Sequence, residues 1–280
     1  MLLFSKMRYK FATKNWFNIS DIKDLSRALE TRRFTETLEP LVMSGPDGKN
    51  ILVLAPHPDD EALGPGGTLL KMAGKNKNIK IIIFSSGETS NVNTDRNKGR
   101  RERESLKAAN IIGARIEFLG LAQKEIISNS VVIQKIKSII KEFNPDTVLI
   151  PFFADDHPDH RAVNLAFLSA LKDHPSSVEI WAYQVYSTCI PNVLVDISKV
   201  IKKKLSLIRC YKSQLGRRDW VHYIQGLNAI NSRYLKTNKK KYAETFFVLP
   251  SGEYLKILKK YFMSRKNSPH KTGHKVKKTR

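Results

Sequence analysis

Short apolar runs of strand length alternate with helical patterns from residue 51 onward. The runs "ILVLA" (51–55), "IKIIIFSS" (79–86) and "DTVLIP" (146–151) are almost continuously apolar, which is typical of strands buried on both faces. Such strands alternating with helices predict a doubly wound α/β fold, with a mostly parallel, Rossmann-like sheet and crossover helices. The other elements expected in this region are strands at 115–120 and 178–186 and helices at 66–74, 98–112, 130–143 and 159–172.

The segments on either side of this region follow other patterns. We expect residues 1–48 to form an N-terminal helical extension that leads into the turn "SGPDGKN". The α/β domain should then span residues 49–250, with mostly helix after residue 199 and one late strand at 243–249. In residues 251–280, apolar residues recur at helical spacing beside lysines, which predicts a basic amphipathic helix followed by a disordered tail.

The formal net charge of +23 is concentrated in two stretches. Residues 256–280 contain eight lysines, two arginines and no acid, and residues 199–218 contain five lysines and three arginines. Such charge favours a polyanionic partner, although a solvated, lysine-rich surface explains it equally well. We expect no specific nucleic-acid binding. The amphipathic helix suits either docking on the domain or peripheral contact with an anionic membrane.

The sequence also bears on the cellular compartment. No apolar run approaches the roughly 18 residues needed to cross a bilayer. The first twenty residues lack the apolar core of a secretory signal, although their lack of acids leaves a transit peptide open. Cys189 and Cys210 are too few for a disulfide framework or a thiolate metal site. We therefore expect a cytoplasmic protein, and a homo-oligomer is compatible with the sequence.

Two dense clusters of histidine and aspartate follow two of the expected strands. "HPDDE" (57–61) comes directly after the first strand, and "ADDHPDH" (154–160) comes after the fourth. In a doubly wound sheet of strand order 3-2-1-4-5, the first and fourth strands are neighbours, and the crevice at their carboxyl ends is the usual ligand site. The two clusters are therefore expected to meet at one place.

Histidine nitrogens and carboxylate oxygens together suit zinc or another divalent transition metal. Three protein ligands with one open position would make a catalytic site rather than a structural one. Each cluster also has a simpler explanation, since acids are favourable at a helix N-terminus and histidines occur in turns. That explanation has to hold at both strand ends at once. The glycines of "GPGG" (64–67) do not have dinucleotide-binding spacing.

The motifs "APHPDDEALGPGGT" and "HPDH" resemble those of the PIG-L/LmbE family of zinc-dependent N-deacetylases. "RERESLKAANIIGA", "IWAYQVY", "YKSQL" and "YAETFFVL" are similar to further elements of that family, so the resemblance covers residues 48–250. It implies the expected fold and an enzyme that releases acetate from an N-acetylglucosaminyl-type conjugate, with one Zn²⁺ per chain. The alternatives are an amidase acting on a larger acyl group and a non-catalytic basic binding module.

The resemblance also implies roles for individual residues. His57, Asp60 and His160 would bind zinc, and Asp59 would be the general base. His157 would support the oxyanion, and Asp159 would orient a histidine. In one stretch the chain departs from the family, because "SSGETSN" places Ser86 where an aspartate often precedes Gly-Glu. Substrate specificity is therefore less securely implied than the metal chemistry, with Glu88, Arg96 and Arg100 as candidate substrate contacts.

Overall fold

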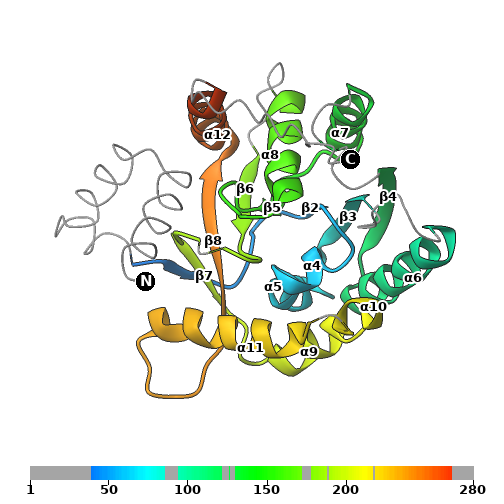
Figure 1. The fold of residues 1–280 in the computed structure, drawn as a ribbon. Coiled ribbons are helices and arrows are strands. Elements are labelled where there is room, and N and C mark those ends of the chain that lie inside the picture. The colour runs from blue at the N-terminus through cyan, green and yellow to red at the C-terminus, as the bar shows by residue number, and fades with distance from the viewer. Residues whose placement is uncertain are drawn as a thin grey trace, which may run out of the picture. The chain divides into compact units, whose positions relative to one another are not determined.

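The computed structural model describes residues 39–85, 94–121, 126, 130–171, 178–187, 189–216 and 218–266, and for residues 94–98 and 263–266 it describes the backbone alone. The expected N-terminal helix and the last part of the basic tail lie outside these residues. The described strands form one sheet in the order β1-β7-β8-β6-β5-β2-β3-β4 (Figure 1). The strands are β1 (Leu41–Met43), β2 (Asn50–Ala55), β3 (Asn78–Ser85), β4 (Arg115–Leu121), β5 (Thr147–Pro151), β6 (Glu179–Tyr183), β7 (Val193–Asp196) and β8 (Ala243–Pro250). The helices are α4 (Asp60–Leu63), α5 (Gly66–Met72), α6 (Thr94–Ile112), α7 (Ser130–Phe143), α8 (Pro158–Leu171), α9 (Ile201–Ile208), α10 (Lys212–Leu215), α11 (Trp220–Asn231), η1 (Ser232–Leu235) and α12 (Ser251–Lys266).

Five parallel strands form the doubly wound half of the sheet. β2 lies at its centre, paired with β3 on one side and β5 on the other. β4 extends the sheet beyond β3, and β6 extends it beyond β5. Counted along the chain from β2, this is the order 3-2-1-4-5 that the sequence predicts. The expected fold class is confirmed.

The other half of the sheet is only partly as expected. The late strand is present as β8, which lies between β6 and β7 and runs antiparallel to both. β1 and β7, which pair in parallel, were not expected. They are only three and four residues long, too short for a hydrophobic period to identify. β1 thus belongs to the sheet although it precedes residue 49, where the α/β domain was expected to begin.

Helices cover both faces of the sheet (Figure 1). α7, α8 and α12 lie on one face, and the other helices lie on the opposite face. Successive residues of β2 divide between the two resulting cores, as side chains of a strand must. Ile51 and Val53 pack with residues of α5, α6 and α9, whereas Leu52 and Leu54 pack with residues of α7, α8 and α12. This explains why β2 is continuously apolar in sequence.

The basic C-terminal helix is present as α12 and docks on the domain. Tyr254 and Leu258 are completely buried in the core beneath α8 and β8. The Tyr254 hydroxyl donates a hydrogen bond to Asn164 Oδ1 at 2.6 Å. Buried residues cannot also insert into a bilayer, so the packing favours docking over the membrane contact that was the other alternative.

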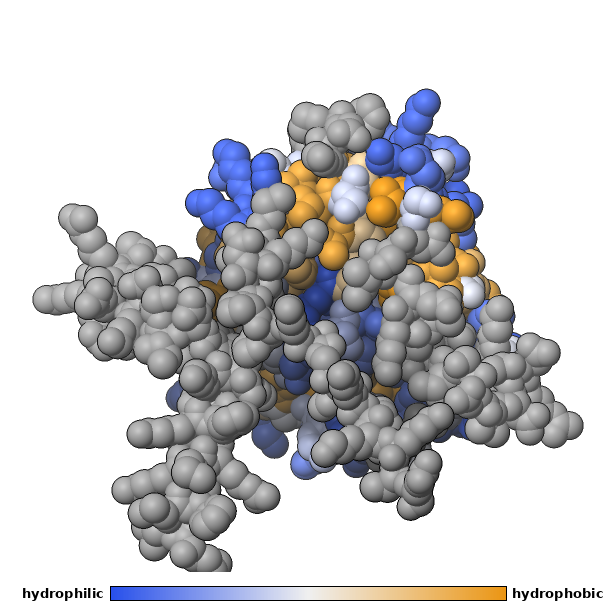
Figure 2. Space-filling view, turned by 45° about the horizontal axis from the view of Figure 1, so that its top comes forward, coloured by the Kyte–Doolittle hydropathy of each residue, from blue (hydrophilic) through white to orange (hydrophobic). Residues whose placement is uncertain are grey.

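Hydrophobic and hydrophilic residues are unevenly distributed over the surface. In the view of Figure 2, hydrophobic residues gather in the upper middle, with hydrophilic residues on both sides. Several large apolar side chains of the described residues are exposed, among them Leu41, Val131 and Ile230. The high net charge of the chain therefore does not exclude apolar surface. Within the described residues, no helix combines the length and apolar character needed to cross a bilayer.

Gly64, which ends α4, gives a first testable prediction. A Cβ at Gly64 would lie 2.3 Å from Cδ2 of Tyr183, whose buried hydroxyl donates to the Leu54 carbonyl oxygen. We expect Gly64→Ala to lower the free energy of unfolding by about 1–3 kcal/mol, because the ring has nowhere to move. In the control Gly226→Ala, within α11, the added Cβ meets nothing within 4 Å, and stability should rise by up to about 1 kcal/mol. Denaturant unfolding of both variants measures this, and equal effects would contradict the close packing.

Candidate metal centre and active site

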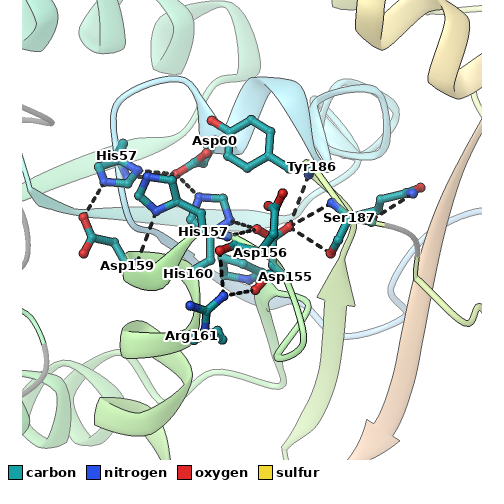
Figure 3. Close-up of polar contacts among 12 residues, drawn as sticks. His57, Asp60, Asp155, Asp156, His157, Asp159, His160, Arg161, Tyr186 and Ser187 are labelled. Atoms are coloured by element: carbon teal, nitrogen blue, oxygen red, sulfur yellow. Dashed lines mark hydrogen bonds and ion pairs between the residues drawn. The ribbon is translucent and has the colours of Figure 1, made fainter. Parts of the chain in front are cut away.

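The two histidine clusters lie at the carboxyl edge of neighbouring strands. One follows β2 and the other follows β5, and these strands pair in parallel with Leu52 opposite Val148. Pro158 opens α8, a favourable position for proline, and this places His160 in the first turn. Figure 3 shows the side chains of both clusters gathered at one place, although 102 residues separate His57 from Asp159, which it contacts. The expected meeting of the clusters is confirmed.

His57 and His160 each lie between two carboxylates. His57 Nδ1 is 3.3 Å from Asp60 Oδ2, and its Nε2 is 2.9 Å from Asp159 Oδ2. His160 Nε2 is 3.3 Å from the same Asp60 oxygen, and its Nδ1 is 3.2 Å from Asp155 Oδ1. All five side chains are buried. Each imidazole is thus oriented by an outer carboxylate and turns its other nitrogen toward Asp60.

This donor set fits a tetrahedral metal ion. Ligand atoms roughly 2.0–2.1 Å from such an ion lie roughly 3.3–3.4 Å apart, and both histidine nitrogens are 3.3 Å from Asp60 Oδ2. Metal-binding histidines usually donate their second N–H to a carboxylate, as Asp159 and Asp155 would accept it here. In addition, both ring nitrogens of His160 are buried without a well-formed hydrogen bond to any described residue. His57, Asp60 and His160 could therefore hold a divalent cation.

His157 could also be taken for a ligand, because the nearest nitrogens of the three histidines all lie within 4.8 Å of one another. Its contacts favour another role. The Asp159 backbone N–H donates to His157 Nδ1 at 3.2 Å, so the proton of the neutral ring lies on Nε2. His157 also lines an open cleft, whereas His57 and His160 are buried. His157 can therefore donate a hydrogen bond from Nε2 to a group in the cleft.

Asp59 has a strained backbone conformation beside the cluster. Its φ of 117° lies in the left-handed region, which non-glycine residues rarely adopt and which is common at functional sites. The Asp59 N–H donates to Glu61 Oε2 at 3.3 Å, and Glu61 in turn accepts the hydroxyl of buried Tyr211. Arg101 donates to the carbonyl oxygen of the residue before Asp59 at 3.0 Å. These contacts hold the backbone of Asp59 in its left-handed conformation, so that Asp59 and Asp60 point to different surroundings.

The simpler explanation of the acids is only partly correct. Asp60 and Glu61 do begin a helix, α4, and Asp59 precedes it without a side-chain capping hydrogen bond. All three acids are nevertheless almost completely buried. Burying carboxylates is costly unless they are paired or bind a cation, and stabilising a single turn of helix does not require it.

Burial and neighbouring charges shift the pKa values of the site residues in different directions. Burial, followed by the adjacent Asp60 carboxylate, raises the pKa of Asp59 to about 8. Burial alone would lower the pKa of His160, but the carboxylates of Asp60 and Asp155 raise it to about 10. Burial and the neighbouring histidines lower the pKa of His157 to about 4. Positive charge is thus favoured at His160, beside Asp60, while His157 is neutral at pH 7.

The three expected substrate contacts are not placed at the cluster by the described residues. Glu88 lies outside them, and only the backbone of Arg96 is described. Arg100 Nε lies 3.4 Å from Glu104 Oε1, and the Arg100 side chain is 53% exposed. The next residue, Arg101, is the one that reaches the site. It shares the buried face of α6 with positions 105, 108 and 112, a helical spacing that could have identified it.

Asp155 is the site residue that sequence reasoning missed. Besides His160, it contacts three backbone groups, accepting the N–H of His157 at 2.9 Å, of Tyr186 at 3.2 Å and of Ser187 at 3.4 Å. The adjacent acid Asp156 is exposed. Two consecutive aspartates in a loop have no periodicity, so the sequence alone does not show which one turns inward.

The glycines 64–67 position a helix rather than a phosphate. At the start of α5, the backbone N–H groups of Gly67 and Thr68 donate to the carboxylate of Glu244 at 2.6 and 2.8 Å. Glu244 is also paired with the buried Lys204 at 2.6 Å. A protein carboxylate therefore occupies the helix N-terminus at which a pyrophosphate would bind, which supports the rejection of a dinucleotide site.

Comparisons with known proteins agree with this geometry. Residues 52–171, which contain both histidine clusters, match the family model described as PIG-L, GlcNAc-PI de-N-acetylase. The chain is 29% identical to the diacetylchitobiose deacetylase of Thermococcus kodakarensis over 236 residues, 75% of this chain and 86% of that protein. It is 30% identical to the uncharacterised deacetylase YaiS of Escherichia coli K12 over 184 residues, 62% of this chain and 96% of that protein.

A solved structure shows the same fold. The N,N'-diacetylchitobiose deacetylase from Pyrococcus horikoshii, in complex with an inhibitor, superposes with a TM-score of 0.64 at 22% identity. The match covers 74% of this chain and 86% of that one. The family model and the match to YaiS, which covers 96% of that protein, identify the family. The chain belongs to the PIG-L family of deacetylases.

Proposed function

We propose that this protein is a zinc-dependent N-deacetylase of an N-acetylglucosaminyl-type conjugate. Its family establishes it as an enzyme that hydrolyses N-acetyl amides, and the Thermococcus relative is named for a diacetylated amino-sugar substrate. The observation that carries the metal assignment is the position of His57 and His160, each between Asp60 and an outer carboxylate. In this proposal Zn²⁺ is held by His57, Asp60 and His160, one ion per chain.

In this mechanism, Asp59 and His157 have separate catalytic roles beside the metal. When bound, a Zn²⁺ ion supplies a Lewis acid for the amide carbonyl and makes a water more acidic. Asp59, whose ionised form an adjacent cation would favour, accepts the proton of that water and passes it to the leaving nitrogen. The oxygen adds to the acetyl carbon, the C–N bond breaks, and the products are acetate and a free amine. His157 donates its Nε2 proton in a hydrogen bond to the carbonyl oxygen as negative charge develops there.

The outer carboxylates have a positioning role. Asp159 fixes the tautomer and orientation of His57, and Asp155 does the same for His160. Asp159 also presents its backbone N–H to His157 Nδ1, which fixes the tautomer of the oxyanion donor. A single residue thus orients one histidine on the metal side and one on the substrate side.

Two alternatives are less well supported. An amidase of the same fold that acts on a larger acyl group would use the same residues, and activity on acyl chains of increasing length separates it from a deacetylase. A basic binding module has no use for the buried carboxylate of Asp59, which a strained backbone holds beside the metal site. We further infer that the enzyme acts in a reducing compartment such as the cytoplasm, since Cys189 and Cys210 are both free.

Metal removal tests the proposed function. Protein purified without chelator should contain about one zinc per chain and release acetate from N-acetylglucosaminyl conjugates. Dialysis against a chelator should remove the metal and the activity together, and added Zn²⁺ or a similar ion should restore both. Metal analysis and an acetate assay on the same samples measure this. Normal deacetylation by metal-free protein would refute the zinc mechanism.

A further inference from the structure

α4 is a single turn of helix, and the two acids at its start are those on which the proposed mechanism depends. It runs from Asp60 to Leu63, with Asp59 directly before it. A helix this short is not stable by itself, and the Asp59 side chain makes no capping hydrogen bond to it. Contacts from other parts of the chain must therefore hold Asp59 and Asp60 in position.

α9 and the turn after it hold both ends of α4. These helices lie on the same face of the sheet (Figure 1). Lys204, in α9, donates from its ammonium group to the carbonyl oxygen of Gly64, the residue that ends α4, at 3.0 Å. Tyr211, in the turn between α9 and α10, donates from its hydroxyl to Oε1 of Glu61 in α4. Lys204 and Tyr211 are both buried, so water does not compete for either contact.

The contact of Tyr211 continues to the peptide group that precedes Asp59. Glu61 uses its second oxygen, Oε2, to accept the Asp59 N–H at 3.3 Å. On the other side of the same peptide group, the Pro58 carbonyl oxygen accepts a hydrogen bond from Arg101 at 3.0 Å. This peptide plane is thus held at both its donor and its acceptor. Because φ is the rotation between that plane and the rest of Asp59, the two contacts together set its left-handed φ of 117°.

The position of Tyr211 is itself well defined. Its ring is part of the hydrophobic core on that face of the sheet. In α10, Ser213 donates its backbone N–H to Glu104 of α6 at 3.0 Å, and its hydroxyl donates to the same carboxylate. The segment that carries Tyr211 is therefore attached to α6, the helix that also supplies Arg101. A hydroxyl held in this way can fix the carboxylate that it contacts.

We propose that Tyr211 is a positioning residue for proton transfer by Asp59. By holding Glu61, it fixes the peptide plane before Asp59 and so directs the Asp59 carboxylate. The inference rests on the proposed function, because it assumes that Asp59 is the general base. It goes beyond that function by giving a role in turnover to a residue of the C-terminal helices that acts only through Glu61. It also explains why the stretch "YKSQL", which begins with Tyr211, belongs to the enzyme's machinery.

The first measurement compares Tyr211→Phe with a matched control, using N,N'-diacetylchitobiose as the probe and acetate release as the readout. Phenylalanine keeps the ring in the core and removes only the hydroxyl. We expect kcat to fall about tenfold, since misplacing a reacting group by about 1 Å can cost about a hundredfold. KM should stay within about twofold, and about one zinc per chain should be retained. Ser213→Ala removes a hydroxyl-to-carboxylate hydrogen bond from the same segment, and its kcat should stay within about twofold of the parent.

A double-mutant cycle shows whether Tyr211 acts through Asp59. In Asp59→Asn the base is already absent, so adding Tyr211→Phe should slow the enzyme by less than about twofold more. A general support of the fold would instead slow both backgrounds by the same factor. A tenfold loss in both backgrounds, an equal loss from Ser213→Ala, or a loss of zinc would therefore overturn the proposal. So would a normal kcat for Tyr211→Phe.

A second variant covers the case in which Tyr211→Phe does not fold. Glu61→Asp keeps the charge of the carboxylate, but its side chain is one methylene too short to reach both the Tyr211 hydroxyl and the Asp59 N–H. The same loss of kcat, with zinc retained and with no further loss in the Asp59→Asn background, is expected for Glu61→Asp. Normal turnover of Glu61→Asp would overturn the positioning role.

A structural measurement keeps this proposal distinguishable from the proposed function. If the parent releases no acetate, or if Asp59→Asn is fully active, the proposed function or its general base is wrong. Crystal structures of the parent and of Tyr211→Phe still test the contact itself. We expect φ of Asp59 to leave the left-handed region in the variant, whereas an unchanged φ would overturn the inference that Tyr211 sets it.

Discussion

Replacing Asp60 by alanine is expected to remove the metal and the activity together. Asp60 Oδ2 lies 3.3 Å from a ring nitrogen of both His57 and His160, so it completes the donor set. Two neutral imidazoles bind Zn²⁺ much more weakly than two imidazoles and a carboxylate do. Metal content should fall from about one ion per chain to almost none, and acetate release should fall to background. Metal analysis beside initial rates measures both effects.

The controls for this prediction separate metal loss from unfolding. Asp60 also accepts the His57 backbone N–H at 2.9 Å, so alanine leaves a buried donor without its acceptor, which costs stability. Asp60→Asn keeps an oxygen acceptor but removes the charge, and it should lose the metal while unfolding close to the temperature of the metal-free parent. The same chemical change at the exposed Asp47 should alter neither property. An Asp60→Asn protein that retains its zinc and its turnover would contradict the assignment.

The central part of the fold could be predicted because its physical signal is local. β2, β3 and β5 are buried on both faces, so nearly every residue in them is apolar and each strand is visible on its own. Their order then follows from the rules for crossover connections. β1 and β7 gave no such signal, since three or four residues are too few to show a period. Their place in the sheet depends on β8, which pairs with β7 from far along the chain.

In the candidate site as well, some residues could be predicted from their spacing in the sequence, whereas others are defined only by tertiary contacts. His57, Asp60 and His160 could be picked out because they stand in dense motifs at two strand ends that the sheet order makes adjacent. Asp155 and Asp156 are consecutive acids in a loop, and the backbone of that loop decides which of them meets His160.

Asp59 and Asp60 are neighbours in sequence, yet the structure gives them different surroundings. Asp60 lies in α4 with its carboxylate between two histidines. Asp59 precedes that helix with a left-handed φ. The carboxylate of Asp60 accepts the backbone N–H of His57, whereas none of the described backbone N–H groups donates to the carboxylate of Asp59. Strain of this kind persists only where the surroundings enforce it, and here Glu61 and Arg101 do so. The cost is consistent with a carboxylate that must lie near the metal without binding it.

The second large effect is therefore expected from Asp59→Asn. Asparagine has the shape of aspartate and can adopt a left-handed backbone, so the fold and about one zinc per chain should be retained. It cannot accept a proton from water, and turnover should fall about a hundredfold or more, the usual scale for a general base. Metal analysis, thermal unfolding and initial rates on the same preparation measure this, with Asp60→Asn as the contrasting variant that loses the metal. Equal zinc loss in the two variants would make Asp59 a ligand, and near-normal turnover of Asp59→Asn would show that the proton goes elsewhere. Only the combination of retained zinc and lost turnover assigns proton transfer to Asp59 and metal binding to Asp60.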